Sequence, residues 1–210
     1  EWRDKYKGQF DDGWHAYRAQ LLEGQKKLGL IPEDSEMVDW PESLPEWDSF
    51  SEEAKEYLAL QMEVNAAFME HVDHHVGRVI DHLEALGELD NTLVIYIQGD
   101  NGSSAEGGLT GTFNELVHLN GLFDVETIDS MLARAEDWGG PDSFPHMACG
   151  WAVATDVPFA YTKQVASDYG GTRNGMVMHW PKGIKSRGEI RSQWHHVNDV
   201  APTVLDATNI

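Results

Sequence analysis

The sequence is short of cysteine, of basic residues and of long apolar runs. Cys149 is the only cysteine among 210 residues, which excludes a disulfide framework and a cysteine-based zinc site. Lysine and arginine number 15 against 36 aspartate and glutamate, so the formal net charge is −21 with histidine neutral. A surface of this charge repels phosphate backbones, and we expect no nucleic-acid partner. No apolar run approaches the roughly 20 residues of a membrane-spanning helix, so we also expect no membrane span.

The length allows one sizeable domain. A chain of 210 residues with 41% hydrophobic residues can bury roughly 70% of the surface that it exposes when unfolded. The first residue is Glu1 rather than methionine, and the sequence begins within a pattern of aromatic and charged residues. We therefore expect that further sequence precedes this chain in a longer protein.

The stretch from Asn91 to Gly108 joins a predicted strand to a loop of metal-ligating residue types. Residues 93–97 are apolar and largely β-branched, which predicts a strand covered on both faces. Asp100 and Asn101 follow it, and in open α/β sheets ligands bind beyond the carboxyl ends of the strands. Carboxylate and amide oxygens suit a hard cation. An Asn-Gly pair is also a strong hairpin signal, so the residue types alone leave a metal site and a plain turn equally open.

The segment before this strand predicts a long amphipathic helix. Apolar residues recur at three- and four-residue steps over residues 51–86, and Gly87 is placed to end the helix. Helix, short turn and buried strand form half of a crossover unit, so we expect an α/β fold with a mainly parallel sheet flanked by helices. The remaining predicted elements are helices over 14–28, 125–138 and 196–210 and a second buried strand over 176–180.

Two other groups of residues are of metal-ligating types. His71 and His75 stand at i,i+4 spacing, as in a zinc-chelating pair. No third ligand follows at motif spacing, so surface or packing roles are favoured. Asp11 and Asp12 precede the predicted helix 14–28, where capping of the helix is favoured over metal binding.

Three stretches, in this order, carry a resemblance to a known family. They are LDNTLVIYIQGDNGSSAEGG, PFAYTKQVASDYGGTRNGMVMHWPKGI and HHVNDVAPTVLDATNI. Together they closely resemble the sulfatase family of the alkaline-phosphatase-like superfamily, and KYKGQFDDGWHAYR and the helix 51–86 also look like segments of bacterial arylsulfatases. The resemblance implies an alkaline-phosphatase-like α/β fold. It also implies that residues 1–210 are a partial sulfatase catalytic domain, without its N-terminal part and its C-terminal subdomain.

The resemblance implies a metal site and a contact to sulfate. Sulfatases hold calcium, in some cases magnesium, and Asp100 and Asn101 fall on the metal-binding Asp-Asn pair of the family. Calcium takes six to eight oxygen ligands, so the other ligands must come from elsewhere. Lys163 falls on the lysine that contacts the sulfate group, where an ammonium would stabilise charge on the leaving-group oxygen. For Arg173 we expect a structural role.

The nucleophile of the family has no counterpart in this chain. It is a formylglycine made from the first residue of a C/S-x-P-x-R motif, and Cys149 stands in CGWAV, without the proline or the arginine. We expect Cys149 to be a small buried hydrophobic residue. We further expect that the full-length protein hydrolyses small-molecule or carbohydrate sulfate esters, through a formylglycine outside this chain, and that residues 1–210 alone are inactive. The alternatives are a metal-dependent phosphodiesterase or phosphatase of the same superfamily and an inactive metal-binding module. No residue pattern indicates an oligomeric state or a compartment.

Overall fold

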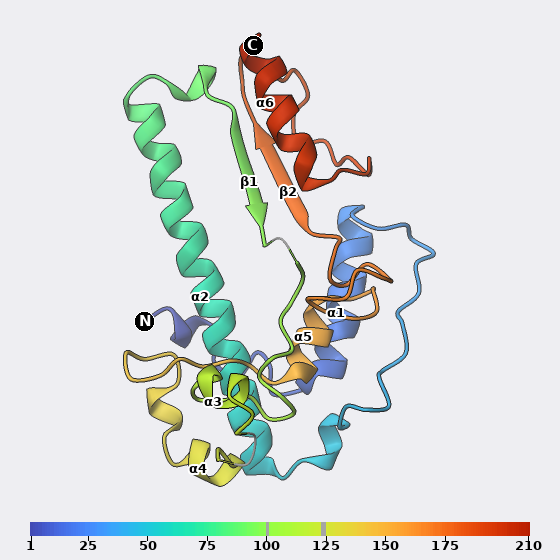
Figure 1. Cartoon of the computed structure of the whole chain (residues 1–210), viewed down its shortest axis with the longest axis vertical. Helices are drawn as coiled ribbons and strands as arrows, with labels where there is room; N and C mark the ends of the chain where they lie inside the picture. Colours follow the sequence, from blue (N-terminus) through green and yellow to red (C-terminus); the bar gives the residue numbers. More distant parts are fainter. Residues whose placement is uncertain (100, 123–124) are drawn as a thin grey trace.

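The computed structural model describes residues 1–99, 101–122 and 125–210 and is rich in helix (Figure 1). A long helix, α2, runs along one side, and a two-stranded ribbon lies between it and the C-terminal helix, α6, at one end of the molecule (Figure 1). Helices α1 and α5 and the short helices α3 and α4 gather toward the other end (Figure 1). In order, the elements are α1 (Gly13–Leu28), α2 (Glu52–Ala85), β1 (Val94–Gln98), α3 (Glu115–Leu119), α4 (Ile128–Leu132), α5 (Cys149–Thr155), β2 (Gly175–His179) and α6 (Val200–Thr208).

Helix α2 confirms the element predicted over residues 51–86, and local signals explain both of its ends. The Ser51 side chain accepts a hydrogen bond from the Ala54 N–H at 3.3 Å, which caps the first turn. Gly87 follows the helix with φ of +73°, a conformation that glycine adopts without steric cost. The N-terminal half of α2 packs in the core, whereas Phe68 at the middle of the helix and Val79 in the second half are exposed.

The two strands correct the predicted sheet. Both strands form where expected, but β1 and β2 pair antiparallel, with Val94 opposite His179 and Gln98 opposite Gly175. Within the described residues they form a two-stranded sheet, so a mainly parallel sheet is not confirmed. The prediction that β1 is covered on both faces is wrong for these residues, since its partner strand supplies no second layer and Ile97 is 41% exposed. The antiparallel partner is also distant in sequence, so the Asn-Gly pair after β1 does not form a β-hairpin.

Aromatic side chains from α1, α5 and the loops before α1 and α2 form the main core, together with aliphatic side chains from α2. Trp151 of α5 and Trp14 of α1 are fully buried, with ring centroids 5.8 Å apart in an edge-on arrangement. The Trp151 Nε1–H donates to the carbonyl oxygen of Leu58 in α2 at 2.7 Å. Gly150 lets α5 approach α1, because a Cβ there would lie 2.7 Å from the Trp14 ring. Cys149 is buried beside this core, which confirms the expectation from sequence.

Three other helix predictions need correction in detail. Helix α1 begins at Gly13 with Asp12 as its N-cap residue, but no side chain caps it, so the expected capping role of Asp11 and Asp12 is wrong. Residues 125–138 form the short helix α4 and a 3₁₀ turn rather than one helix, and α6 follows a 3₁₀ turn at Val197–Asp199. None of the helices in the described residues is both long enough and apolar enough to cross a membrane.

Candidate functional site

The loop after β1 and the segment that carries Lys163 lie side by side. The backbone N–H of Lys163 donates to the carbonyl oxygen of Ser103 at 2.9 Å. Asn101, two residues before Ser103, is exposed. Asp100, the other predicted metal ligand, lies outside the described residues. The structure thus brings the segments of Asn101 and Lys163 together, while the roles of all three residues stay predictions.

Glycines allow this close approach of two backbones. Gly102 has φ of +77°, and its N–H donates to the Asn174 Oδ1 atom at 3.0 Å. A Cβ at Gly102 would overlap the carbonyl oxygen of Gly170, and a Cβ at Gly170 would overlap the carbonyl oxygen of Tyr161. Because only glycine fits at position 102, the loop after β1 can lie directly against the Lys163 segment, and Gly170 lets that segment fold back on itself.

The backbone around Lys163 is strained. Tyr161 and Gln164, on either side of it, have φ of +66° and +77°, and Asp168 and Tyr169 have φ of +60° and +73°. Residues with a side chain rarely adopt positive φ, and such conformations persist only where the surrounding structure enforces them. A cluster of them at a predicted sulfate-binding lysine is therefore consistent with a functional segment.

The side chain of Lys163 is held by Glu106, which sequence reasoning missed. The Lys163 Nζ atom donates to Glu106 Oε2 at 2.8 Å, and Ser104 Oγ donates to the same oxygen at 2.7 Å. Gln164 Nε2 donates to Glu106 Oε1 at 2.9 Å. The hydrogen bond from Lys163, followed by that from Ser104, lowers the pKa of Glu106. The only signal in the sequence was an acidic residue among small ones in the loop after the Asp-Asn pair.

A second carboxylate, Asp156, supports the start of the same loop. The Ser103 N–H donates to Asp156 Oδ1 at 3.0 Å, and the Ser103 hydroxyl lies 2.5 Å from that of Thr155. The other oxygen, Asp156 Oδ2, is buried and has no hydrogen-bond partner among the described residues. Burial raises the pKa of Asp156 to about 7, so a carboxyl group in this position binds its proton far more tightly than usual.

The donor chemistry of the loop suits a hard cation, although the described residues supply only part of a site. Asn101 offers an amide oxygen of the kind that calcium accepts. Within residues 1–99, 101–122 and 125–210, no group of three or more His, Cys, Asp or Glu side chains is arranged to hold a metal ion. A calcium ion bound through Asp100 and Asn101 therefore needs oxygen ligands beyond those described.

The histidine pair on α2 is better explained without metal. The Nε2 atoms of His71 and His75 lie 3.0 Å apart, and Arg78 Nη1 lies 2.8 Å from His75 Nδ1. Because arginine can only donate, Nδ1 of His75 is an acceptor, and the ring proton of the neutral form is on Nε2. The Nε2 atom then has no lone pair for a metal, which favours the surface role inferred from spacing.

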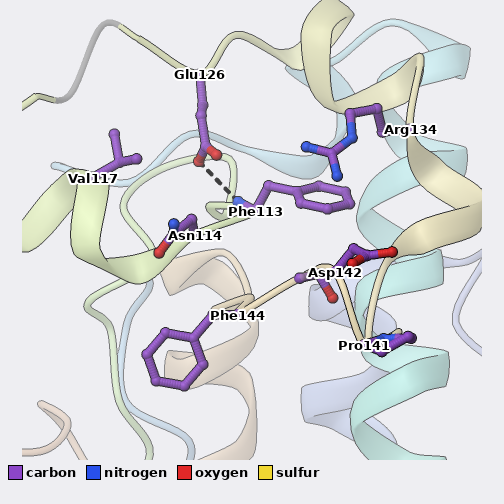
Figure 2. A pocket seen from close by; sticks show the side chains of 9 residues that line it. Phe113, Asn114, Val117, Glu126, Arg134, Pro141, Asp142 and Phe144 are labelled. Atoms are coloured by element: carbon purple, nitrogen blue, oxygen red, sulfur yellow. Dashed lines mark hydrogen bonds between the residues drawn. The ribbon is translucent and has the colours of Figure 1, made fainter.

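Two pockets among the described residues differ in their linings. One, of about 430 Å³, is lined by residues of 113–144 (Figure 2). Two of its charged side chains have protein partners, since Glu126 accepts from the Phe113 N–H at 2.8 Å and Arg134 packs over the Phe113 ring. The other, of about 390 Å³, is mostly apolar and includes Ala105 and Thr162, the neighbours of Glu106 and Lys163.

The structure thus places the ammonium of Lys163, paired with Glu106, against the loop that follows β1. Comparison with known proteins gives the class of protein. The family model for sulfatases matches residues 1–210, so the chain belongs to the sulfatase family. This confirms the resemblance and supports an alkaline-phosphatase-like α/β fold.

Two curated relatives are similar over the whole chain. An uncharacterized sulfatase of Schizosaccharomyces pombe is 35% identical over 213 residues, and an arylsulfatase of Klebsiella aerogenes is 28% identical over 210 residues. The matches cover 100% of this chain but only 36% and 42% of those two proteins. The chain thus spans about two fifths of the length of these relatives.

Proposed function

We propose that the full-length protein containing this chain hydrolyses sulfate esters, with Lys163 binding the sulfate group and Asp100 and Asn101 contributing to a calcium site. The observation that carries the proposal is the hydrogen bond from the Lys163 N–H to Ser103, which keeps the ammonium-bearing segment next to the loop of Asn101. Membership of the sulfatase family and similarity to an arylsulfatase support the same chemistry.

Charge explains why a lysine is needed at this position. The chain has a formal net charge of −21, so this part of the protein repels an anionic ester. An ammonium at the sulfate compensates this repulsion locally and stabilises the negative charge that develops on the leaving-group oxygen. A calcium ion, when bound, would neutralise further charge on the sulfate. The nucleophile in our proposal is a formylglycine outside residues 1–210, so this chain alone is inactive.

The proposal is tested by steady-state kinetics on the full-length protein with 4-nitrophenyl sulfate and calcium. Lys163→Ala should lower kcat/KM about 100-fold or more, the usual loss when one group stabilising a developing oxyanion is removed. Lys185→Ala is the matched control, because Lys185 is exposed and lies outside the site. An unchanged rate for Lys163→Ala, or faster hydrolysis of 4-nitrophenyl phosphate than of the sulfate, would contradict the proposal.

A further inference from the structure

We propose that Glu106 is a positioning residue for Lys163: its carboxylate fixes the ammonium in the orientation in which it meets the substrate. The inference rests on the proposed function and deepens it, since it identifies what makes Lys163 competent to bind sulfate. Glu106 lies in the loop after β1, 57 residues before Lys163 in the sequence.

The geometry around Glu106 is that of an anchored carboxylate. Ser104, from the same loop, and Lys163 both donate to Oε2, while Gln164, from the lysine segment, donates to Oε1. Glu106 thus connects the two segments through side chains as well as holding the ammonium. The pKa of Glu106 is lowered, so its carboxyl group is ionised near neutral pH.

Two histidines also lie close to Glu106. The His146 Nε2 atom lies 3.9 Å from Glu106 Oε2, and the His146 side chain is largely buried. The His118 Nδ1 atom lies 3.3 Å from the carbonyl oxygen of Glu106. These contacts restrict both the backbone and the carboxylate of Glu106, so the ammonium of Lys163 binds a partner that is itself fixed.

A fixed partner matters for lysine in particular. Its ammonium sits on a flexible four-carbon stem and loses considerable rotamer entropy when it is held in one place. An ammonium has three N–H donors, and the contact to Glu106 uses one of them, which leaves two for sulfate oxygens. Hydrogen bonds from Ser104 and Gln164 compensate the negative charge of Glu106. Glu106 therefore orients the cation at little electrostatic cost to an incoming anion.

A first experiment measures the interaction between Glu106 and Lys163 independently of catalysis. The full-length protein is treated with acetic anhydride at pH 8, and the acetylation rate of each lysine is measured by peptide mass spectrometry. Glu106→Gln should raise the rate at Lys163 about tenfold, as expected when a charge-assisted hydrogen bond is lost. Glu52→Gln is the matched control, because Glu52 pairs with Lys55 at 3.0 Å on an exposed helix turn and its loss should leave Lys163 unchanged.

A second experiment tests whether the pair acts as a unit in turnover. Glu106→Gln should lower kcat/KM for 4-nitrophenyl sulfate about 10-fold or more, mainly through kcat, with an unchanged melting temperature. The double variant Glu106→Gln/Lys163→Ala should be no slower than Lys163→Ala within about twofold, because Glu106 acts only through Lys163. If Glu106→Gln does not fold, Glu106→Asp takes its place. It keeps the charge but ends one methylene short, and the same non-additivity is expected.

The outcomes separate this inference from the proposed function. Unchanged acetylation of Lys163 in Glu106→Gln, an unchanged or higher kcat/KM, or losses that multiply in the double variant would each overturn the inference. If Lys163→Ala still impairs turnover in that case, the proposed function stands without it. If no sulfate ester is hydrolysed but acetylation of Lys163 rises in Glu106→Gln, the proposed function fails and the anchoring of Lys163 by Glu106 is supported.

Discussion

Replacing Gln61 should destabilise the protein strongly, because this side chain ties α2 to both segments that flank the candidate site. Gln61 is 1% exposed. Its Nε2 atom donates to the carbonyl oxygen of Thr110 at 2.8 Å, and its Oε1 atom accepts from the Ala148 N–H at 2.9 Å. Gly111, next to Thr110, has φ of +81°, and a Cβ there would lie 2.5 Å from Gln61 Nε2, so the fit leaves no room for rearrangement.

The expected loss of stability follows from the two backbone groups that lose their hydrogen-bond partner. Gln61→Met keeps the length of the side chain but leaves the Thr110 carbonyl and the Ala148 N–H buried without hydrogen bonds. Each such group costs about 1–3 kcal/mol, so the free energy of unfolding should fall by about 2–6 kcal/mol. Urea unfolding followed by tryptophan fluorescence measures the change, with an unchanged m value as the sign that the denatured state is unaffected.

Gln20→Met is the control for this experiment. Gln20 lies on the exposed face of α1, where the same substitution should change the free energy of unfolding by no more than about 0.5 kcal/mol. A loss in Gln61→Met no larger than in Gln20→Met would refute the role of Gln61 as a tie between α2 and the site.

Two further predictions concern α5 and the residue that follows it. Trp151→Phe removes part of a fully buried ring and the N–H that donates to the Leu58 carbonyl oxygen. The free energy of unfolding, measured in urea, should therefore fall by about 2–4 kcal/mol. Trp194→Phe, at an exposed position, is the control and should have little effect. Burial raises the pKa of Asp156 to about 7, so Asp156 retains in the folded state a proton that it releases near pH 4 in the unfolded state. Its contribution to stability should therefore decline between about pH 4 and pH 7 and level off above. Asp156→Asn keeps an acceptor for the Ser103 N–H but removes the charge. The free energy of unfolding of this variant, relative to wild type, should rise by about 2 kcal/mol between pH 4 and pH 8, after allowance for partial exposure. A difference that does not depend on pH would contradict this prediction.

Elements with strong local signals were predictable from the sequence. Helix α2 has an apolar stripe, a capping serine at Ser51 and a closing glycine at Gly87, and the structure contains the helix within one residue of the expected bounds. The strands β1 and β2 also form at the predicted places. Their pairing direction was not predictable, because an apolar run indicates a strand but carries no information about which strand lies beside it.

The residues of the candidate site also differ in whether the sequence alone could predict them. Lys163 was identified through the motif around it, and its segment does lie against the loop after β1. Glu106 was missed because its contacts to Lys163 and Gln164 join residues that are 57 and 58 positions apart, which no periodicity or spacing rule connects. Asp156 was missed for a related reason, since its raised pKa arises from burial that only the folded chain creates.

Helix α5 links the aromatic core to the loop that carries Glu106. At its N-terminus the Cys149 N–H donates to the carbonyl oxygen of Gly108 at 2.8 Å, and just beyond its C-terminus Asp156 accepts from the Ser103 N–H at 3.0 Å. A seven-residue helix of about 10 Å thus holds both ends of residues 103–108. Trp151 fixes the helix itself by packing between α1 and α2. The position of the carboxylate that holds Lys163 therefore depends on a tryptophan in the core, and the rigidity of the candidate site follows from the packing of the helices rather than from the short strand that precedes the loop.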